Sequence, residues 1–392
     1  MLIPLAQAQA RLLALATPLA VETLPLAQAA GRWAAADVLA TRTQPDRDLS
    51  AMDGYAIRYA DLPGPLRLIG ESAAGRSFAG SAGAGDAVRI FTGAALPDGA
   101  DTVLVQEEAS VEGAIIHLAG EGPSRPGGNV RPRGLDFHAR STLIARGERI
   151  TPPRLALAAI GGHGALAVHR RVRVAIAATG DELVPPGRNL SAGQLPESNG
   201  VMLAAQLAGL PVALVDLGIL PDRLDALTAA FASVDADVLV TSGGASVGDH
   251  DLVRPALEAA GATIDFWRVA LRPGKPMMAG RLRRTTVLGL PGNPVSAFVT
   301  AELFLKPLIA HLAGAADPLP RTLAAQLGEP LPPNGERADY LRAELRDGRV
   351  FASTIQDSSM LRILARADCL IVRHPGAAPA SSGDSVEILP LA

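Results

Sequence analysis

The stretch from Asp237 to Asp251, DVLVTSGGASVGDHD, joins a strand-like run to a loop of small residues. Val238 to Thr241 are apolar or β-branched, which is typical of a strand buried on both faces of a parallel sheet. A loop with so little side-chain bulk lets backbone N–H groups approach a ligand closely, and the helix N-terminus behind it favours a phosphate group. The predicted phosphate-binding loop consists of Ser242, Gly243, Gly244, Ser246 and Gly248.

Two carboxylates, Asp249 and Asp251, follow this loop directly. A phosphate would be repelled by them unless a cation lay between. Mg²⁺ prefers carboxylate and phosphate oxygens together, so the residues indicate a magnesium site. The alternative is that one of the two aspartates only caps the helix that follows.

Three other predicted strand ends carry small residues or carboxylates, and parallel strands bring such ends to one edge of a sheet. Several uncompensated carboxylates in one crevice would raise one another's pKa values, a cost that a bound cation removes. Taken singly, Asp222 could be a helix cap, Pro291 to Pro294 a rigid turn and Glu182 a surface charge. The residues at these ends are Thr179, Gly180, Asp181 and Glu182, then Asp222, and then Pro291, Gly292, Asn293 and Pro294.

Basic residues supply positive charge for an anionic ligand. Lys275, with Arg268 and Arg272 nearby, would face the carboxylates across such a ligand. Arg131 and Arg133 lie on a glycine-rich segment, and arginine there can make forked contacts with phosphate or another oxyanion. A solvated loop is the alternative for that segment.

The elements that must position these residues alternate regularly between residues 172 and 312. Strand alternating with helix predicts crossover connections and a doubly wound parallel sheet covered on both faces. Residues 270–280 are expected to form a loop. The expected strands cover 173–178, 212–218, 237–241, 263–269 and 285–290, and the expected helices cover 197–209, 222–234, 252–261 and 294–314.

The regions on either side of residues 172–312 do not show this alternation of strand and helix. Helices are predicted at 2–17 and 26–40, and a further helical pattern at 151–167. A β-rich region at 41–140 contains predicted strands at 88–91, 101–106 and 114–118, the last pairing with the second. A proline-rich boundary near 315–320 precedes a small terminal β region, in which Ser358 and Ser359 occupy a polar turn.

Composition excludes several classes of protein. The net charge of −3 offers no basic footprint for nucleic acid. Cys369 is the only cysteine, which rules out an intrachain disulfide and a Cys-rich metal site and favours a cytoplasmic location. The apolar N-terminus has no basic segment before it, so we expect neither a signal peptide nor a membrane span. Neither G-x-G-x-x-G nor G-x-x-x-x-G-K-[ST] follows these strands, which argues against an NAD site and an ordinary P-loop ATPase.

Seven motifs in order along the chain resemble the molybdopterin molybdenumtransferases, the MoeA and gephyrin E-domain family. The resemblance is strong over residues 41–310 and weak in the terminal region. Arg268 and Arg272 stand where the family often has lysine, and Pro132 splits an arginine pair that is often continuous. The motifs are MDGYAIR, RIFTGAALPDGADTVLVQE, GGNVRPRGLD, TGDEL, TSGGASVGDHD, LRPGKP and GLPGNPVSA.

The resemblance implies an enzyme that inserts molybdate into adenylylated molybdopterin and releases AMP, working with Mg²⁺. It implies four parts: an α/β molybdopterin-binding domain (1–20 plus 172–315), a linking domain (21–40 plus 141–171), a β-rich domain (41–140) and a C-terminal β domain (316–392). In this family the β-rich domain commonly comes over the cleft from the second subunit of a homodimer. Other implied partners are molybdopterin adenylyltransferase and the molybdoenzymes that accept the cofactor.

Site residues are carried over by motif. Glu182, Asp222 and Asp251 resemble the acidic set that binds Mg²⁺ and supports cleavage of the anhydride. Lys275 and the Gly243–Gly244 loop would hold phosphate, and Pro291 to Pro294 would shape the pocket floor. The implied functional residues of the β-rich domain are Asp53, Thr92, Arg131 and Asp136.

The residues are also compatible with two other functions. A molybdopterin adenylyltransferase shares the α/β fold and the TSGG-type loop, but needs only the central domain. A molybdopterin-binding scaffold protein is the third reading, although this chain offers no fused domain or long linker for it.

Overall fold

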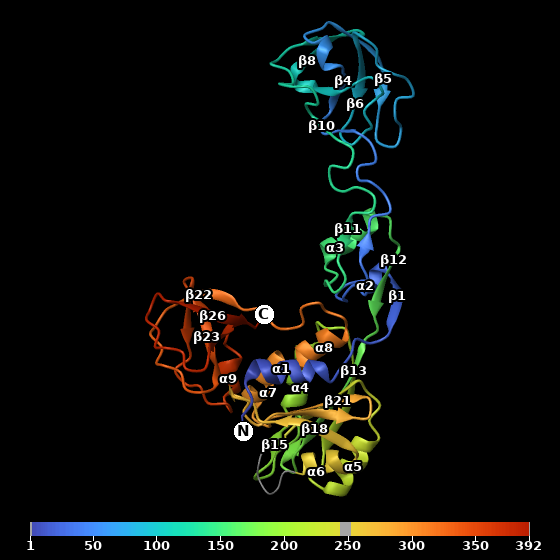
Figure 1. The fold of residues 1–392 in the computed structure, drawn as a ribbon. Coiled ribbons are helices and arrows are strands. Elements are labelled where there is room, and N and C mark those ends of the chain that lie inside the picture. The colour runs from blue at the N-terminus through green and yellow to red at the C-terminus, as the bar shows by residue number, and fades with distance from the viewer. Residues whose placement is uncertain (1, 244–251, 392) are drawn as a thin grey trace. The chain divides into compact units, whose positions relative to one another are not determined.

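A computed structural model describes residues 2–243 and 252–391 of the chain (Figure 1). The chain forms two compact units. The first comprises Met1–Ala36, Arg146–Ile150 and Ala167–Ala392, and the second comprises Asp37–Ala145 and Thr151–Leu166. The four-part division expected from the sequence stays a prediction.

A six-stranded sheet forms the centre of the first unit. Its first four strands are parallel, and the fifth runs antiparallel to the strands on both of its sides. This mixed α/β architecture confirms the predicted fold class. In spatial order the strands are β16 (Val212–Leu220), β13 (Val172–Thr179), β17 (Val238–Ser242), β21 (Thr285–Leu290), β20 (Met278–Leu282) and β18 (Ala262–Trp267).

Helices cover both faces of this sheet (Figure 1). Successive residues of a strand point to opposite faces. In β13, Val174 and Ile176 therefore pack with one set of helices and Ala175 with the other. One face holds α1 (Leu5–Ala14), α4 (Asn199–Leu207), α7 (Pro294–Thr300) and α8 (Lys306–Leu312), and the other holds α5 (Leu224–Ala232) and α6 (Val253–Ala259).

The segment Pro294–Leu312 is one continuous helical stretch, with a π-helical turn, η3 (Ala301–Leu305), between α7 and α8. By length and composition it is apolar enough to cross a membrane, but 83% of it is buried inside the fold. The stretch is therefore a core helix that packs on the sheet.

One strand of the sheet was not expected. Residues 270–280 were predicted as a loop, whereas Met278–Leu282 form β20 and pair with β21 as an antiparallel hairpin. Gly280 lies within β20, and a Cβ atom there would be 2.4 Å from the carbonyl oxygen of Thr263 in β18. The glycine therefore permits close strand approach rather than ending the strand.

The C-terminal part of the first unit is a closed β-barrel, because β23 pairs with both β24 and β25. A small terminal β region was expected here from the sequence, after the proline-rich boundary near 315–320. The parallel strand β19 (Leu271–Arg272) joins β23, and a short helix, α9 (Leu361–Leu364), lies between β24 and β25. In ring order the barrel strands are β23 (Ala338–Arg346), β24 (Arg349–Ala352), β22 (Leu323–Leu327), β26 (Ser385–Pro390) and β25 (Cys369–Arg373).

The second unit is built on another six-stranded sheet. The strand at 114–118 was expected to pair with the strand at 101–106, but β9 forms a hairpin with β8, and β7 pairs with β4. In spatial order the strands are β7 (Thr102–Val105), β4 (Gly54–Ile57), β6 (Asp86–Ile90), β5 (Leu66–Ser72), β9 (Ile115–Leu118) and β8 (Ala109–Glu112).

Shorter elements complete the second unit. Strand β3 (Leu49–Ser50) pairs with β10 (Val130–Arg131), and β2 (Val38–Leu39) pairs with β11 (Thr142–Ile144). The remaining elements are the helix α3 (Pro152–Ile160) and the 3-10 turns η1 (Tyr59–Asp61) and η2 (Gln106–Glu108).

The helix predicted at 26–40 is wrong in extent, because α2 spans only Leu26–Ala29. Gly31 has a φ of +77°, outside the helical region. Trp33 and Ala34 then form β-bridges with Arg149 and Val168. The predicted helix at 151–167 likewise divides into α3 and the strand β12 (Ala165–His169), which pairs with β1 (Val21–Pro25).

An ion pair fixes the start of the central sheet. Both terminal nitrogens of Arg170 donate to the carboxylate of Asp237 at 2.7 Å, and the backbone N–H of Arg173 donates to it at 2.8 Å. Burial raises the pKa of Asp237, but these hydrogen bonds and the arginine charges outweigh it and lower the pKa. The ionised carboxylate therefore stabilises the fold.

We predict that Asp237→Asn lowers the free energy of unfolding at pH 7 by about 1–3 kcal/mol, because it breaks a charged hydrogen-bond set. The loss should shrink as the pH falls through the lowered pKa of Asp237, since the wild-type group is then protonated too. Urea denaturation at several pH values measures both effects.

Asp235→Asn is the matched control. Asp235 pairs with Arg173 at 2.8 Å, but its side chain is 87% exposed, whereas that of Asp237 is 16% exposed. An exposed pair contributes about 0–1 kcal/mol. Equal losses in the two variants would contradict the prediction.

Candidate functional site

Four parallel strands of the central sheet end side by side. Thr179, the last residue of β13, lies opposite Leu220 of β16, and Ser242 of β17 lies between Ala178 and Leu290. The segments that follow these strands therefore start at one edge of the sheet, as expected for a doubly wound fold. The predicted residues Gly244, Ser246, Gly248, Asp249 and Asp251 lie outside the described residues.

Gly243 sits at the centre of this edge and has a φ of +96°. A Cβ atom on it would be 2.6 Å from the carbonyl oxygen of Thr179, and its backbone N–H donates to the carbonyl of Leu290 at 3.3 Å. Only glycine meets both conditions without strain. The backbones of three strand ends thus come together with no side chain between them.

A cluster of carboxylates flanks Gly243. The backbone N–H of Asp222 donates to the carboxylate of Asp181 at 3.0 Å. Partial burial raises the pKa of Asp222, and the negative charges of Asp181 and Glu182 raise it further. The structure therefore places Glu182 and Asp222 near each other and adds Asp181, which the sequence analysis quoted beside Glu182 but did not select.

Asp222 does not cap the helix that follows it. Helix α5 begins at Leu224, Arg223 occupies the cap position, and no side chain makes a capping hydrogen bond there. The alternative that Asp222 is only a helix cap is therefore wrong. The cluster has a net negative charge that no described basic residue offsets by an ion pair.

Asn199 connects three segments of the site. The sequence analysis did not select it as a site residue and placed it only within the predicted helix 197–209. Its amide nitrogen donates to the hydroxyl of Ser242 and to the carbonyl of Gly292, each at 2.7 Å. Asn199 is buried, and its amide oxygen has no partner among the described residues. The side chain thus fixes the start of α4 against the ends of β17 and β21.

The segment Pro291–Pro294 is held by the C-terminal barrel. The Asn293 amide donates to the hydroxyl of Ser358 at 3.1 Å, and the backbone N–H of Val295 donates to the carbonyl of Ser358 at 3.1 Å. Pro294 is the first residue of α7, where a missing N–H costs nothing. The polar turn containing Ser358 therefore has a structural partner.

The three basic residues expected near the anion differ in their surroundings. Arg272 donates to Asp339 at 2.8 Å through its Nε, and this hydrogen bond raises the pKa of Arg272. Arg268 lies over the ring of Trp267 at 5.3 Å. Lys275 is exposed and forms no ion pair with any residue that the structure describes, so it is the cation free to meet a ligand.

In the second unit, Asp53 and Thr92 form a tight pair. The backbone N–H and the hydroxyl of Thr92 donate to one oxygen of Asp53 at 2.7 and 2.8 Å. These bonds lower the pKa of Asp53, and the charge of Arg89 lowers it further. Arg89 is itself held over the rings of Tyr55 and Phe91.

The other predicted residues of the second unit are not joined to this pair by any hydrogen bond among the described residues. Arg131 is exposed on β10, opposite Leu49 of β3. The backbone N–H of Arg133 donates to Asp48 at 2.7 Å, so this residue helps to fold its own loop. Asp136 is exposed, and its backbone N–H donates to the carbonyl of Gln44 at 3.0 Å.

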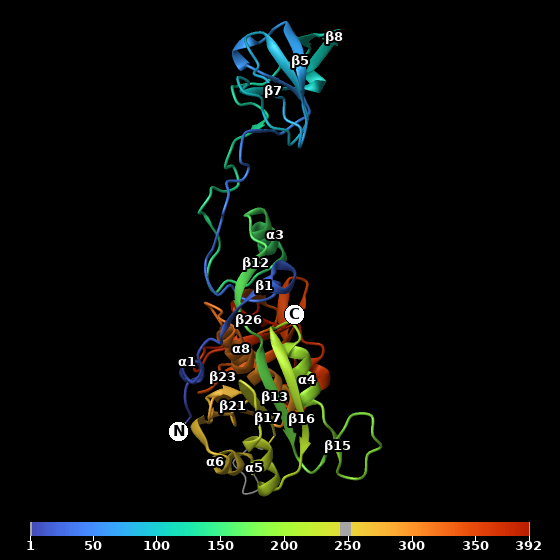
Figure 2. The ribbon, with the colours of Figure 1, turned by 90° about the vertical axis from the view of Figure 1, so that its right-hand side faces the viewer.

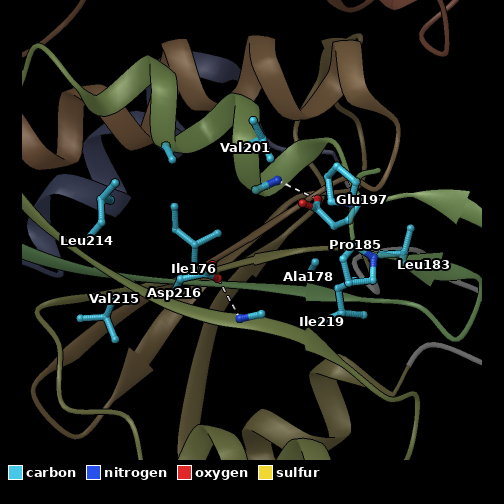
Figure 3. Close-up of a pocket in the computed structure, with 14 residues that line it drawn as sticks. Ile176, Ala178, Leu183, Pro185, Glu197, Val201, Leu214, Val215, Asp216 and Ile219 are labelled. Carbon is cyan, nitrogen blue, oxygen red and sulfur yellow. Dashed lines mark hydrogen bonds between the residues drawn. The ribbon is translucent and has the colours of Figure 1, made fainter. Parts of the chain in front are cut away.

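A pocket of about 790 Å³ lies on the α4 face of the sheet (Figure 3). Residues of β13, β16 and α4 line it, together with the segment that begins after Glu182. Its size is typical of small-molecule sites. The pocket therefore adjoins the strand ends that carry the carboxylates.

Comparisons with known proteins agree along the chain. The MoeA N-terminal region (domain I and II) matches residues 3–162, a probable molybdopterin binding domain matches 175–311, and the MoeA C-terminal region (domain IV) matches 324–391. The molybdopterin molybdenumtransferase of Haemophilus influenzae is 35% identical, over 99% of this chain and 98% of its own. Molybdopterin molybdenumtransferase 2 of Mycobacterium tuberculosis is 37% identical, over 89% and 90%.

A solved structure agrees with these matches. The crystal structure of a molybdopterin biosynthesis MoeA protein from Pyrococcus horikoshii is 28% identical, with a TM-score of 0.81 over 100% of this chain and 99% of that one. Sequence and fold thus point to one group of proteins, and the chain belongs to the molybdopterin molybdenumtransferase (MoeA) family.

Proposed function

We propose that this chain is an enzyme of molybdenum cofactor biosynthesis that inserts molybdate into adenylylated molybdopterin, with Mg²⁺-dependent release of AMP. The observation that carries the proposal is the cluster of Asp181, Glu182 and Asp222 beside the Gly243 backbone. Mutual repulsion in such a cluster favours a cation, and a tight glycine turn gives a phosphate access to the backbone.

The donor set suits Mg²⁺, because carboxylate oxygens are the ligands this ion prefers. Glu182 and Asp222 would supply part of the coordination, and the sequence assigns Asp249 and Asp251 to the rest. Within residues 2–243 and 252–391, no group of three or more His, Cys, Asp or Glu side chains is arranged to hold a metal ion. Mg²⁺ would polarise a phosphoryl oxygen and offset the charge on the departing AMP.

The chain's own residues have separate tasks in this proposal. Asn199 and Gly243 hold the strand ends in one arrangement, so that backbone groups meet the substrate without reorganisation. Lys275 offsets anionic charge. Thr92 keeps Asp53 ionised, so that Asp53 can accept a hydrogen bond from a reacting group and orient it.

The adenylyltransferase alternative is not favoured, because regions on both sides of the central domain match the MoeA models. Formation of adenylylated pterin from molybdopterin, ATP and Mg²⁺ without molybdate would support that alternative instead. A homodimer, contacts with an adenylyltransferase and with cofactor-accepting molybdoenzymes, and a cytoplasmic location are further proposals that rest on the resemblance.

We predict that Asp222→Ala lowers Mg²⁺-dependent AMP release by about 100-fold or more, because the variant removes a proposed metal ligand. The assay supplies adenylylated molybdopterin, molybdate and Mg²⁺ and measures AMP. Asp225→Ala is the control, since Asp225 is exposed in the first turn of α5 and pairs with Arg223. Wild-type AMP release by Asp222→Ala would remove this residue from the site.

We also predict that Asp222→Asn raises the melting temperature of the metal-free protein at pH 7. A raised pKa means that the fold penalises the ionised form, so the amide removes a cost. The difference should vanish as the pH falls below the ordinary pKa of about 3.8, where the wild-type carboxyl is protonated in both states.

Thermal melts at several pH values measure this difference. Excess Mg²⁺ should raise the melting temperature of the wild type more than that of the variant, because a ligand stabilises the state that binds it. A less stable metal-free variant at pH 7 would show that Asp222 is a structural residue instead.

Asp53→Ala should leave the adenylylated substrate bound but stop insertion of molybdate. Asp53 lies in another unit of the chain from the carboxylate cluster, and its ionised form is maintained by Thr92. Substrate retention after gel filtration and the yield of active cofactor are the two measurements. Glu71→Ala, which removes an exposed acid paired with Arg76 in the same unit, should change neither. A normal cofactor yield from Asp53→Ala would refute the role.

A further inference from the structure

The pocket on the α4 face of the sheet has mainly apolar walls. Ile176 and Ala178 of β13 form its floor, Ile219 of β16 lies at one side, and Val201 and Ala204 of α4 form the roof. In Figure 3 the side chains of Ile176, Ala178 and Val201 lie around one space between helix and sheet. Apolar walls of this kind suit a planar ring system.

Glu197 is the buried carboxylate of this pocket, with only 9% of its surface exposed. Its backbone N–H donates to the carbonyl of Val184 at 2.8 Å, next to the short ladder of β14 (Leu183–Val184) and β15 (Leu195–Pro196). One carboxylate oxygen accepts the backbone N–H of Gly200 at 2.7 Å, in the first turn of α4. Both ends of the residue are therefore fixed.

The second oxygen of Glu197 accepts no hydrogen bond from any described residue. It differs from Nε of Arg32 and Oδ1 of Asn199, which also lack a hydrogen-bond partner but are fully buried. The carboxylate faces the pocket in Figure 3. A carboxylate buried with unused acceptor capacity costs free energy, which a ligand with suitable donors recovers. The pocket thus combines apolar walls with a fixed, buried acceptor at Glu197, whereas the carboxylate of Asp216, which accepts the N–H of Gly218 at 2.8 Å, is exposed.

This pocket adjoins the candidate site. Asn199, two residues after Glu197, donates to Ser242 and Gly292 at the strand ends. The backbone N–H of Leu195, two residues before Glu197, donates at 2.8 Å to the carbonyl of Glu182 in the carboxylate cluster. The segments that line the pocket therefore also position the candidate site.

We propose that this pocket holds the pterin ring of the substrate, with Glu197 accepting hydrogen bonds from N3–H and the 2-amino group. The assignment rests on the proposed function, which supplies a substrate with two ring systems. The 2-amino-4-oxopyrimidine edge of a pterin places two donors side by side, and a carboxylate matches them with two acceptors. Adenine has a single amino group flanked by ring acceptors, which the carboxylate repels, so the adenine ring belongs elsewhere.

The test uses the full-length protein and two fluorescent probes that differ at one position, pterin and lumazine. Lumazine carries a carbonyl where pterin carries the 2-amino group, so it presents an acceptor to Glu197. Fluorescence titration should show that the wild type binds pterin about 10- to 100-fold more tightly than lumazine. AMP should not compete with pterin.

Glu197→Gln is the informative variant. The amide oxygen can still accept from Gly200, but the amide nitrogen meets the 2-amino group of pterin as donor against donor and suits the lumazine carbonyl. We expect the variant to bind pterin about tenfold or more weakly and to lose or reverse the preference over lumazine. Asp225→Asn is the control, because Asp225 is an exposed acid outside the pocket lining that pairs with Arg223. It should retain the wild-type preference.

The inference is overturned if the wild type binds pterin and lumazine equally, if pterin does not bind, or if Glu197→Gln keeps the wild-type preference. The comparison of probes on the wild type decides the matter even if the variant does not fold. The proposed function is tested separately by AMP release. A protein that discriminates pterin from lumazine but releases no AMP would retain the pocket assignment and lose the reaction.

Discussion

The close approach of three backbones at Gly243 is the constraint on which the candidate site depends. Gly243 follows β17 directly, and a Cβ atom on it would be 2.6 Å from the carbonyl oxygen of Thr179. Because no side chain fits on that side, the polar side chains of the site lie around the contact and not within it. Asp181, Asp222 and Asn199 occupy those flanking positions, each attached to a neighbouring strand end. The registry of the parallel sheet therefore determines which side chains can act together.

The electrostatics of the site oppose the stability of the empty fold. At the amino ends of the strands, the charges of Arg170 and Asp237 offset each other in an ion pair. At the carboxyl ends, by contrast, like charges are held next to each other and Asp222 is driven toward its protonated form. Functional sites commonly contain such unfavourable arrangements, because ligands supply the missing charge.

The sequence predicted the alternation of strands and helices well, because β13, β16, β17 and β21 are apolar and the intervening helices have clear boundaries. It failed where distant contacts decide local structure. Gly280 lies in the stretch predicted as a loop, but it permits β20 to approach β18. Trp33 forms a β-bridge with Arg149, where the sequence predicted a helix. Site residues next to a recognisable loop could be proposed from the sequence. Asn199 was not, since its role depends on two segments that are distant in sequence.

Strand β16 forms an outer border of the central sheet (Figure 2), and a row of unpaired backbone groups on such a border can template intermolecular strand addition. Its register against β13 shifts after Ile176, and Gly218 there adopts a φ of +68°. The shift interrupts the row midway, as bulges do in many soluble proteins. The border strand that lines the α4-face pocket is thereby a poorer template for pairing with another chain.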